Sequence, residues 1–454
     1  MTTVLQRETF QTSRSLDFCS AKQLTIETGH PPEQWPLVIL KELLDNALDE
    51  AEEAGVPPEI TVCVRVGMGT GSDAIVITDN GRGIPPEVVE GILDYTVRVS
   101  SREAYVSPTR GAQGNALKTI VAMPFALDGK SGTTVITGRG VGHAIVFRVD
   151  HLRQEPVVDH RRWPEPTTKG TTVQVSWPDS ASSILAGAKS RFLQIAEDYG
   201  WVNPHLRIHV EWNGVVEVDR EPSDSAWQKW PPSYPTSAHW YDAYRLERYI
   251  AAHAARDQQL GRNRTVREFI SEIRGFSGSA KQKRALDETG LARASIASLF
   301  GPDGSPDRHQ IEALLASLKR HSRPVKAQAL GVIGNTHLLA CLTGAGAHPE
   351  STKYKRVLGI GEDRLPCVLE TAFGYCPSGI DHRRIVAGAN WSVSLGNPFR
   401  SFGRHGEGLE SILTEQRARY AEPIIFVVHF ACPRIEFTDR GKSAIAIRGG
   451  ADAS

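Results

Sequence analysis

The stretch KELLDNALDE, residues 41–50, places acidic and amide side chains at a regular spacing. The longer segment WPLVILKELLDNALDEAEEAG, residues 35–55, has the pattern of an amphipathic helix. At about 100° per residue, Glu42, Asn46 and Asp49 fall on one stripe of this helix, and leucines and alanines occupy the far side. The spacing alone favours an ordinary solvated face.

The residue types in this stripe point to chemistry instead. A carboxylate one turn before an amide can orient a water molecule while the amide oxygen binds Mg²⁺. Mg²⁺ takes few protein ligands and completes its octahedron with water and phosphate oxygens. Glu42 is therefore the candidate base and Asn46 the candidate Mg²⁺ ligand.

A second motif is IVITDNGRGIP, residues 75–85. An apolar strand delivers Asp79 to the edge of a sheet, where its carboxylate can accept a hydrogen bond from an exocyclic amine. The glycines on either side of Arg82 allow the backbone to pass close to a flat ligand. The Asn-Gly dipeptide is also typical of a plain hairpin turn, which is the alternative here.

Two further motifs follow. In SPTRGAQGNALKTIVAMPFAL, residues 107–127, a glycine-rich loop leads into a helix predicted to begin near Asn115. Backbone amides at a helix N-terminus form an anion site, and Lys118 adds a positive charge for outer phosphates. In KGTTVQVSW, residues 169–177, Thr171 begins a predicted strand, where threonine is commonplace.

Taken in this order, the four motifs resemble the ATP site of the GHKL ATPase superfamily, which includes gyrase, MutL, MORC proteins and histidine kinases. Within that superfamily the chain is most similar to the B subunits of type IIB topoisomerases (topoisomerase VI). The resemblance implies an ATP-binding protein that uses Mg²⁺.

The resemblance also implies roles for individual residues. Glu42 is the expected general base, Asn46 the Mg²⁺ ligand and Asp79 the adenine-reading carboxylate, with Gly83 in the adenine turn and Thr171 near the adenine. Asp49 is expected to shape the site more than to take part in chemistry. The expected phosphate-binding residues are Gly111, Ala112, Gln113, Gly114, Asn115, Ala116 and Lys118. Ala116 stands where the family has a third lid glycine, and we expect binding to survive this change.

The predicted fold class is α/β, as an α+β sandwich, with three domains. We expect a GHKL ATP-binding domain with an N-terminal strap at 1–222 and a linker plus a helix-two-turns-helix domain at 223–345. A transducer domain of the ribosomal-protein type is expected at 346–454. There, Lys442 lies where the family has a switch lysine that reaches the γ-phosphate.

The helical insert carries a basic cluster of Lys281, Lys283 and Arg284. Such a cluster can bind DNA phosphates without reading bases, and a solvated basic face is the equal alternative. The chain as a whole has 52 basic and 52 acidic residues, so attraction to DNA must come from local patches of this kind.

Composition indicates where the protein works. Its six cysteines form no CxxC pair, which argues against a zinc ribbon and fits a reducing compartment. The polar N-terminus and the lack of an apolar run of about 20 residues argue against a signal peptide or membrane helix. We expect a cytoplasmic, nucleoid-associated protein without membrane contact.

The expected function is that of an ATP-hydrolysing subunit of a type IIB topoisomerase-like complex. ATP would close a homodimer around double-stranded DNA. The sequence contains no toprim-like acidic cluster and no tyrosine-nucleophile domain, so a separate A-type subunit would cleave the DNA. The alternative is a freestanding ATP-operated DNA clamp of the MORC or MutL kind. A degenerate nucleotide sensor is a third possibility, against which Glu42 argues.

Overall fold

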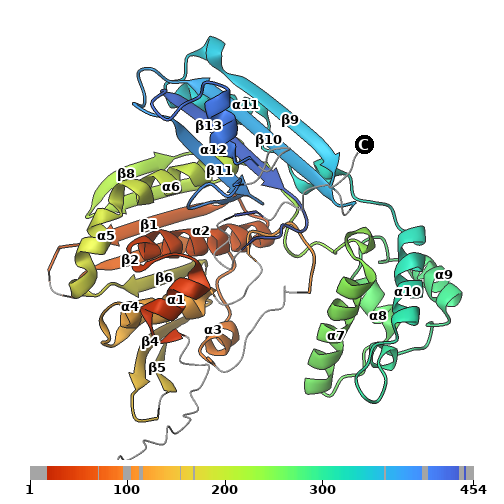
Figure 1. Cartoon of the computed structure of the whole chain (residues 1–454). Coiled ribbons are helices and arrows are strands. Elements are labelled where there is room, and N and C mark those ends of the chain that lie inside the picture. The colour runs from red at the N-terminus through yellow and green to blue at the C-terminus, as the bar shows by residue number, and fades with distance from the viewer. Residues whose placement is uncertain are drawn as a thin grey trace, which may run out of the picture.

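The described residues form two β-sheets and one helical unit (Figure 1). The computed structural model describes residues 18–69, 71–95, 104–111, 116–153, 155–166, 169–361, 364–400, 407–438 and 444–445. Within these ranges, no helix combines the length and the apolar content needed to cross a bilayer.

The first sheet has the strand order β5-β4-β3-β6-β2-β1-β7-β8 among the described residues. Its strands are β1 Glu59–Arg65, β2 Ala74–Asp79, β3 Gly132–Gly138, β4 Val141–Asp150, β5 Glu155–Pro164, β6 Thr171–Ser176, β7 Arg207–Trp212 and β8 Val215–Arg220. Neighbours are antiparallel except for the parallel pair β1 and β7. Buried and more exposed residues alternate along β1, β3 and β6, as expected when helices cover only one face of a sheet.

Helices pack on that sheet to form the predicted α/β sandwich (Figure 1). The helices on its face are α2 Trp35–Ala54, α4 Ala116–Asp128 and α6 Lys189–Val202. α1 Ala21–Thr28 packs on α4, α5 Ser182–Gly187 contacts α6, and α3 Pro86–Ile92 follows β2 in the chain. α2 is the central one, because its fully buried leucines Leu40, Leu44 and Leu48 enter the core and it contacts both β2 and α6. The helix stops at Gly55, which takes up a left-handed conformation.

The helical unit stands apart from both sheets in Figure 1. It contains α7 Ala243–Gln259, α8 Val266–Ser271, α9 Ser279–Thr289 and α10 Arg308–His321. The segment 223–240 is rich in Pro, Ser and Trp, a composition that predicts a linker or a connection lying on the surface, and it buries Trp230 and Trp240 almost completely. This connection is therefore anchored by its aromatic side chains.

The second sheet has the order β12-β11-β13-β10-β9 among the described residues. Its strands are β9 Lys353–Ile360, β10 Pro366–Tyr375, β11 Arg384–Ala389, β12 Ser392–Val393 and β13 Ile424–Ala431, accompanied by α11 Asn335–Gly344 and α12 Leu409–Glu415. Because α11 packs on β9 and β10, we place it with the second sheet.

Some element predictions were wrong in detail. The sequence RRIVAGANWSV, residues 383–393, has the apolar pattern of a single strand, but the structure splits it by a turn at Asn390 and Trp391, whose φ angles are 50° and 63°. The sequence EGLESILTEQRARYAE, residues 407–422, predicts one helix, but in the structure the helix is limited to α12. The strands β5, β8 and β9 were not predicted, because edge strands keep much of their surface exposed and so lack a clear apolar pattern.

Replacing Leu44 by alanine tests the central role of α2 in the core. The side chain is fully buried, so Leu44→Ala should lower the free energy of unfolding by about 2–5 kcal/mol. Chemical denaturation measures this change. Leu152→Ala is the control, because Leu152 is 97% exposed and its loss should change the free energy by less than about 0.5 kcal/mol. Equal effects of the two substitutions would contradict the packing described.

Candidate nucleotide site

The open face of α2 carries Glu42 and Asn46. Asn46 is exposed, and the Glu42 side chain retains 25% of its accessible surface. Lys41 donates from Nζ to Glu42 Oε1 at 3.4 Å and to Asp45 Oδ2 at 2.9 Å. A buried ammonium therefore holds the Glu42 carboxylate from one side and leaves it within reach of a ligand.

Asp79 lies at the end of β2, next to the start of β6. Its Oδ1 accepts hydrogen bonds from the backbone N–H of Gly81 at 2.8 Å and of Thr171 at 3.1 Å. Burial raises the pKa of the Asp79 carboxyl, and these two N–H groups act in the opposite direction. The structure thus brings Asp79 and Thr171 together and fixes the orientation of the carboxylate.

Glycines are required where these two strands meet. At Gly170, with φ of 73°, a Cβ atom would lie 1.9 Å from the carbonyl oxygen of Asp79. At Gly83, with φ of 80°, a Cβ atom would lie 2.8 Å from the carbonyl oxygen of Gly170. The backbone N–H of Gly170 also donates to the carbonyl of Gly81 at 3.0 Å. The turn after Asp79 is therefore too tightly packed for any side chain at these positions.

Two polar contacts hold this turn in place. Thr171 Oγ1 accepts a hydrogen bond from the backbone N–H of Ile84 at 3.0 Å. Arg139, at the left-handed corner between β3 and β4, donates from Nε to the carbonyl of Gly83 at 2.8 Å. Sequence reasoning missed Arg139; the Arg-Gly corner between two predicted strands was the available signal.

Glu50 was also missed, although it lies on α2 one turn beyond Asn46. Its Cβ atom is 2.9 Å from where a Cβ at Gly81 would lie. Burial raises the pKa of the Glu50 carboxyl, and the nearby carboxylates of Glu53 and Asp79 raise it further. The carboxyl groups of Glu50, Glu53 and Asp79 therefore lie close together at one end of the candidate site.

Asp49, expected to shape the site, and Lys118, expected to bind phosphate, do not join Glu42 and Asn46 on the open face. Asp49 is buried, and its Oδ1 lies 2.7 Å from Arg110 Nη1. Lys118 is buried, donates from Nζ to the carbonyl of Asp94 at 2.6 Å, and has its pKa lowered by burial. Both side chains are engaged within the protein.

The predicted phosphate loop is described only at its two ends. The Gly111 carbonyl accepts a hydrogen bond from Thr109 Oγ1 at 3.2 Å. Ala116 is the first residue of α4, where alanine is a strong helix former. The expected ligands Ala112, Gln113, Gly114, Asn115 and Lys442 lie outside the described residues.

A buried charge network lies beside the site. Arg110 Nη2 contacts Glu52 Oε1 and donates to Asn203 Oδ1, each at 2.6 Å, and Lys229 Nζ lies 2.7 Å from Glu52 Oε2. Burial alone would raise the pKa of Glu52, but the Arg110 and Lys229 charges hold it well below its usual value. These partners are far apart in sequence, so no local pattern could reveal them.

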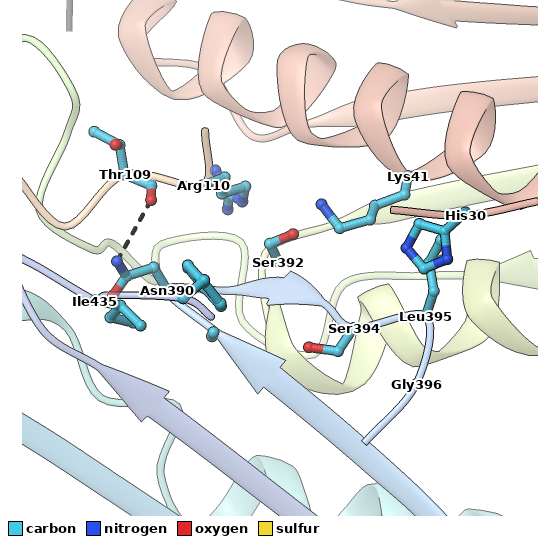
Figure 2. Close-up of a pocket in the computed structure, with 12 residues that line it drawn as sticks. His30, Lys41, Thr109, Arg110, Asn390, Ser392, Ser394, Leu395, Gly396 and Ile435 are labelled. Carbon is cyan, nitrogen blue, oxygen red and sulfur yellow. Dashed lines mark hydrogen bonds between the residues drawn. The ribbon is translucent and has the colours of Figure 1, made fainter. Parts of the chain in front are cut away.

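The pocket in Figure 2 lies on the Lys41 side of α2, against the second sheet. Arg110, Asn390, Ser392 and His30 help to line it. Its volume of about 40 Å³ has room for a few water molecules and is too small for a nucleotide. The faces carrying Lys41 and Asn46 differ by about 140° around the helix, so this pocket is separate from the candidate site.

Gly170→Ala tests the close packing behind Asp79. The substitution should lower the melting temperature clearly more than Gly214→Ala does. Both glycines have left-handed φ angles, of 73° and 75°, but nothing lies within 4 Å of a Cβ at Gly214. The control therefore carries only the conformational cost, of about 1 kcal/mol. Similar losses for both variants, measured by thermal unfolding, would show that the close approach is absent.

The residues of this site lie in a segment that is similar to a known protein family. Residues 33–181, which include α2, the Asp79 turn, Ala116 and Thr171, match the family described as "Histidine kinase-, DNA gyrase B-, and HSP90-like ATPase". This match confirms the resemblance drawn from the four motifs.

Relatives extend the similarity beyond that domain. The B subunit of type 2 DNA topoisomerase 6 from Archaeoglobus fulgidus is 27% identical over 431 residues, which are 90% of this chain and 66% of that protein. Its counterpart in Methanosarcina barkeri is 29% identical over 197 residues, or 41% of this chain and 30% of that protein. The chain therefore spans less than two thirds of the length of these curated relatives.

Among solved structures, the ATPase region of Saccharomyces cerevisiae topoisomerase II aligns with 90% of this chain and with 76% of its own length. The identity is 12% and the TM-score 0.40, which is too low to carry an argument. The assignment comes from the sequence matches. Residues 33–181 match the histidine kinase-, DNA gyrase B- and HSP90-like ATPase family, and the chain is similar along most of its length to the B subunit of topoisomerase 6.

Proposed function

We propose that this chain binds ATP with Mg²⁺ and hydrolyses it as the non-cleaving subunit of a type IIB topoisomerase-like complex. The observation that carries the proposal is the placement of Glu42 and Asn46 on the open face of α2, within a domain that also holds the fixed carboxylate of Asp79. Phosphoryl transfer to water needs mainly positioned groups and charge neutralisation.

Each residue has a distinct proposed task. Asp79, held by two backbone N–H groups, accepts a hydrogen bond from the adenine amino group. Glu42 accepts a proton from the attacking water, while Lys41 keeps its carboxylate in place. Lys442 is proposed to neutralise charge near the γ-phosphate.

The oxygen donors on α2 fit Mg²⁺. Asn46 offers an exposed amide oxygen, and the described residues contain no group of three or more His, Cys, Asp or Glu side chains placed to hold a metal. A bound ion would therefore take most of its ligands from phosphate and water, which is the habit of Mg²⁺. When bound, Mg²⁺ would neutralise phosphate charge.

The proposed partners follow from the similarity to the B subunit of topoisomerase 6 over 90% of the chain. We propose a homodimer that closes on ATP binding, a separate DNA-cleaving A-type subunit, and double-stranded DNA as the substrate. The proposed place of action is the nucleoid.

The helical unit is the proposed DNA contact. Residues 241–330 contain 16 Lys and Arg residues against 10 Asp and Glu residues, although the whole chain is balanced. Lys281, Lys283 and Arg284 are exposed on α9. A locally basic and exposed surface is the electrostatic requirement for binding phosphate backbones.

Glu42→Gln tests the catalytic assignment. The variant should still bind a non-hydrolysable ATP analogue, but its ATP turnover should fall by about 100-fold or more because the general base is lost. In the complex with the DNA-cleaving subunit, it should also fail to relax supercoiled plasmid. The control is Glu87→Gln, at an exposed position in α3, which should keep wild-type turnover.

Wild-type turnover in Glu42→Gln would remove this residue as the base. ATP turnover by the native complex without relaxation would instead favour the ATP-operated DNA clamp.

Removing the three charges on α9 tests the DNA contact. Lys281→Ala/Lys283→Ala/Arg284→Ala should weaken binding to duplex DNA of any sequence and reduce the slope of log affinity against log salt by about 2 to 3. Fluorescence anisotropy at several salt concentrations measures both effects. The matched control removes Lys353, Lys355 and Arg356, three exposed charges on β9 of the second sheet. Equal losses in both triple variants would mean that no local DNA contact exists on α9.

A further inference from the structure

The segment 104–111, which we call the stem, leads directly into the predicted phosphate loop. Its first residues contact the segment that enters the helical unit. Its last residues contact α2 and the carbonyl of Trp391 beside the second sheet. No pattern in the sequence predicted this placement.

The start of the stem is hydrogen-bonded to the segment that enters the helical unit. The backbone N–H of Val106 donates to the phenol oxygen of Tyr241 at 2.9 Å, and Thr236 Oγ1 donates to the carbonyl of Val106 at 2.7 Å. Thr236 is fully buried and Tyr241 is 3% exposed, so solvent does not compete for these bonds. Tyr105 adds a third bond, from its hydroxyl to the carbonyl of Tyr234.

Thr236 and Tyr241 are themselves fastened to the helical unit. The backbone N–H of Arg274 donates to the Thr236 carbonyl, and Lys319 Nζ donates to the Tyr241 carbonyl, both at 2.8 Å. The ring of Tyr241 stacks on that of Tyr249 in α7, with 5.6 Å between centroids. A displacement of the helices would therefore carry both side chains with it.

The end of the stem is held on the opposite side. The Arg110 side chain is fully buried and pairs with Asp49 and Glu52 on α2. Arg110 Nε also donates to the carbonyl of Trp391 at 3.4 Å, and Asn390 Nδ2 donates to the carbonyl of Thr109 at 3.4 Å (Figure 2). The stem is thus fixed at both ends, with Gly111 immediately beyond the second attachment.

We propose that Thr236 and Tyr241 are positioning residues through which DNA bound to the helical unit changes ATP turnover. The proposal rests on the function proposed above. A helical unit that shifts on binding DNA moves Val106 through two short, buried hydrogen bonds. Because Arg110 holds the other end, the stem rotates about that end and repositions Gly111 at the entrance to the phosphate loop.

The double variant Thr236→Val/Tyr241→Phe tests this coupling, since it removes both bonds to Val106 and keeps the size of each side chain. ATP turnover is measured with and without duplex DNA. We expect the rate without DNA, and the KM for ATP, to stay within twofold of wild type. We expect DNA stimulation to fall to less than half, although anisotropy shows unchanged DNA affinity.

Tyr234→Phe is the matched control, because Tyr234 contributes only its backbone carbonyl to the stem and should keep full stimulation. If the double variant does not fold, as judged by thermal melting, Tyr105→Phe is the milder test. It removes the bond to the Tyr234 carbonyl and should lower DNA stimulation while leaving the rate without DNA unchanged.

Unchanged DNA stimulation in Thr236→Val/Tyr241→Phe would overturn the proposed role of these two residues. An equal fall in its ATP turnover with and without DNA would also overturn it. A wild-type chain whose ATP turnover ignores DNA would also overturn it and leave the ATPase assignment standing. A wild-type chain without ATP turnover would refute the proposed function itself.

Discussion

The guanidinium of Arg110 is the interaction on which the arrangement of the parts depends. It donates to Asp49 and Glu52 of α2, to Asn203 at the end of α6, and to the carbonyl of Trp391 beside the second sheet. Burying such a charge is costly unless its N–H groups and the opposing carboxylates are all satisfied. Because this geometry satisfies them, it fixes where α2 lies against the second sheet and holds the stem at Arg110.

α2 can serve three neighbours because its faces are chemically distinct. Its leucines enter the core of the first sheet, and its Glu42 and Asn46 remain open to a ligand. A third face turns to the second sheet, where Ser392 Oγ donates to Asp45 Oδ2 at 2.7 Å. The same Asp45 oxygen accepts from Lys41, which also touches Glu42. Lys41 and Asp45 therefore connect the proposed base, Glu42, to Ser392 of the second sheet.

The sequence was sufficient for features that depend on local spacing. The helix around Glu42, six strands of the first sheet and the acid at the end of β2 each follow from periodicity or from glycine placement within about ten residues. The sequence did not predict which side chains pair with one another. Asp49 lies on the same predicted stripe as Glu42, yet it meets an arginine 61 positions further along the chain. Lys118 was predicted on the right helix, but only the packing around Tyr95 and Asp94 decides that it points inward.

A crystal structure of the chain with Mg²⁺ and a non-hydrolysable ATP analogue would show whether the nucleotide occupies the open face of α2. We expect the adenine amino group within hydrogen-bonding distance of Asp79, the metal on the Asn46 amide and a water molecule between Glu42 and the γ-phosphate. A nucleotide bound on another face of α2, or a filled site in which the metal touches neither Asn46 nor a phosphate, would contradict this expectation.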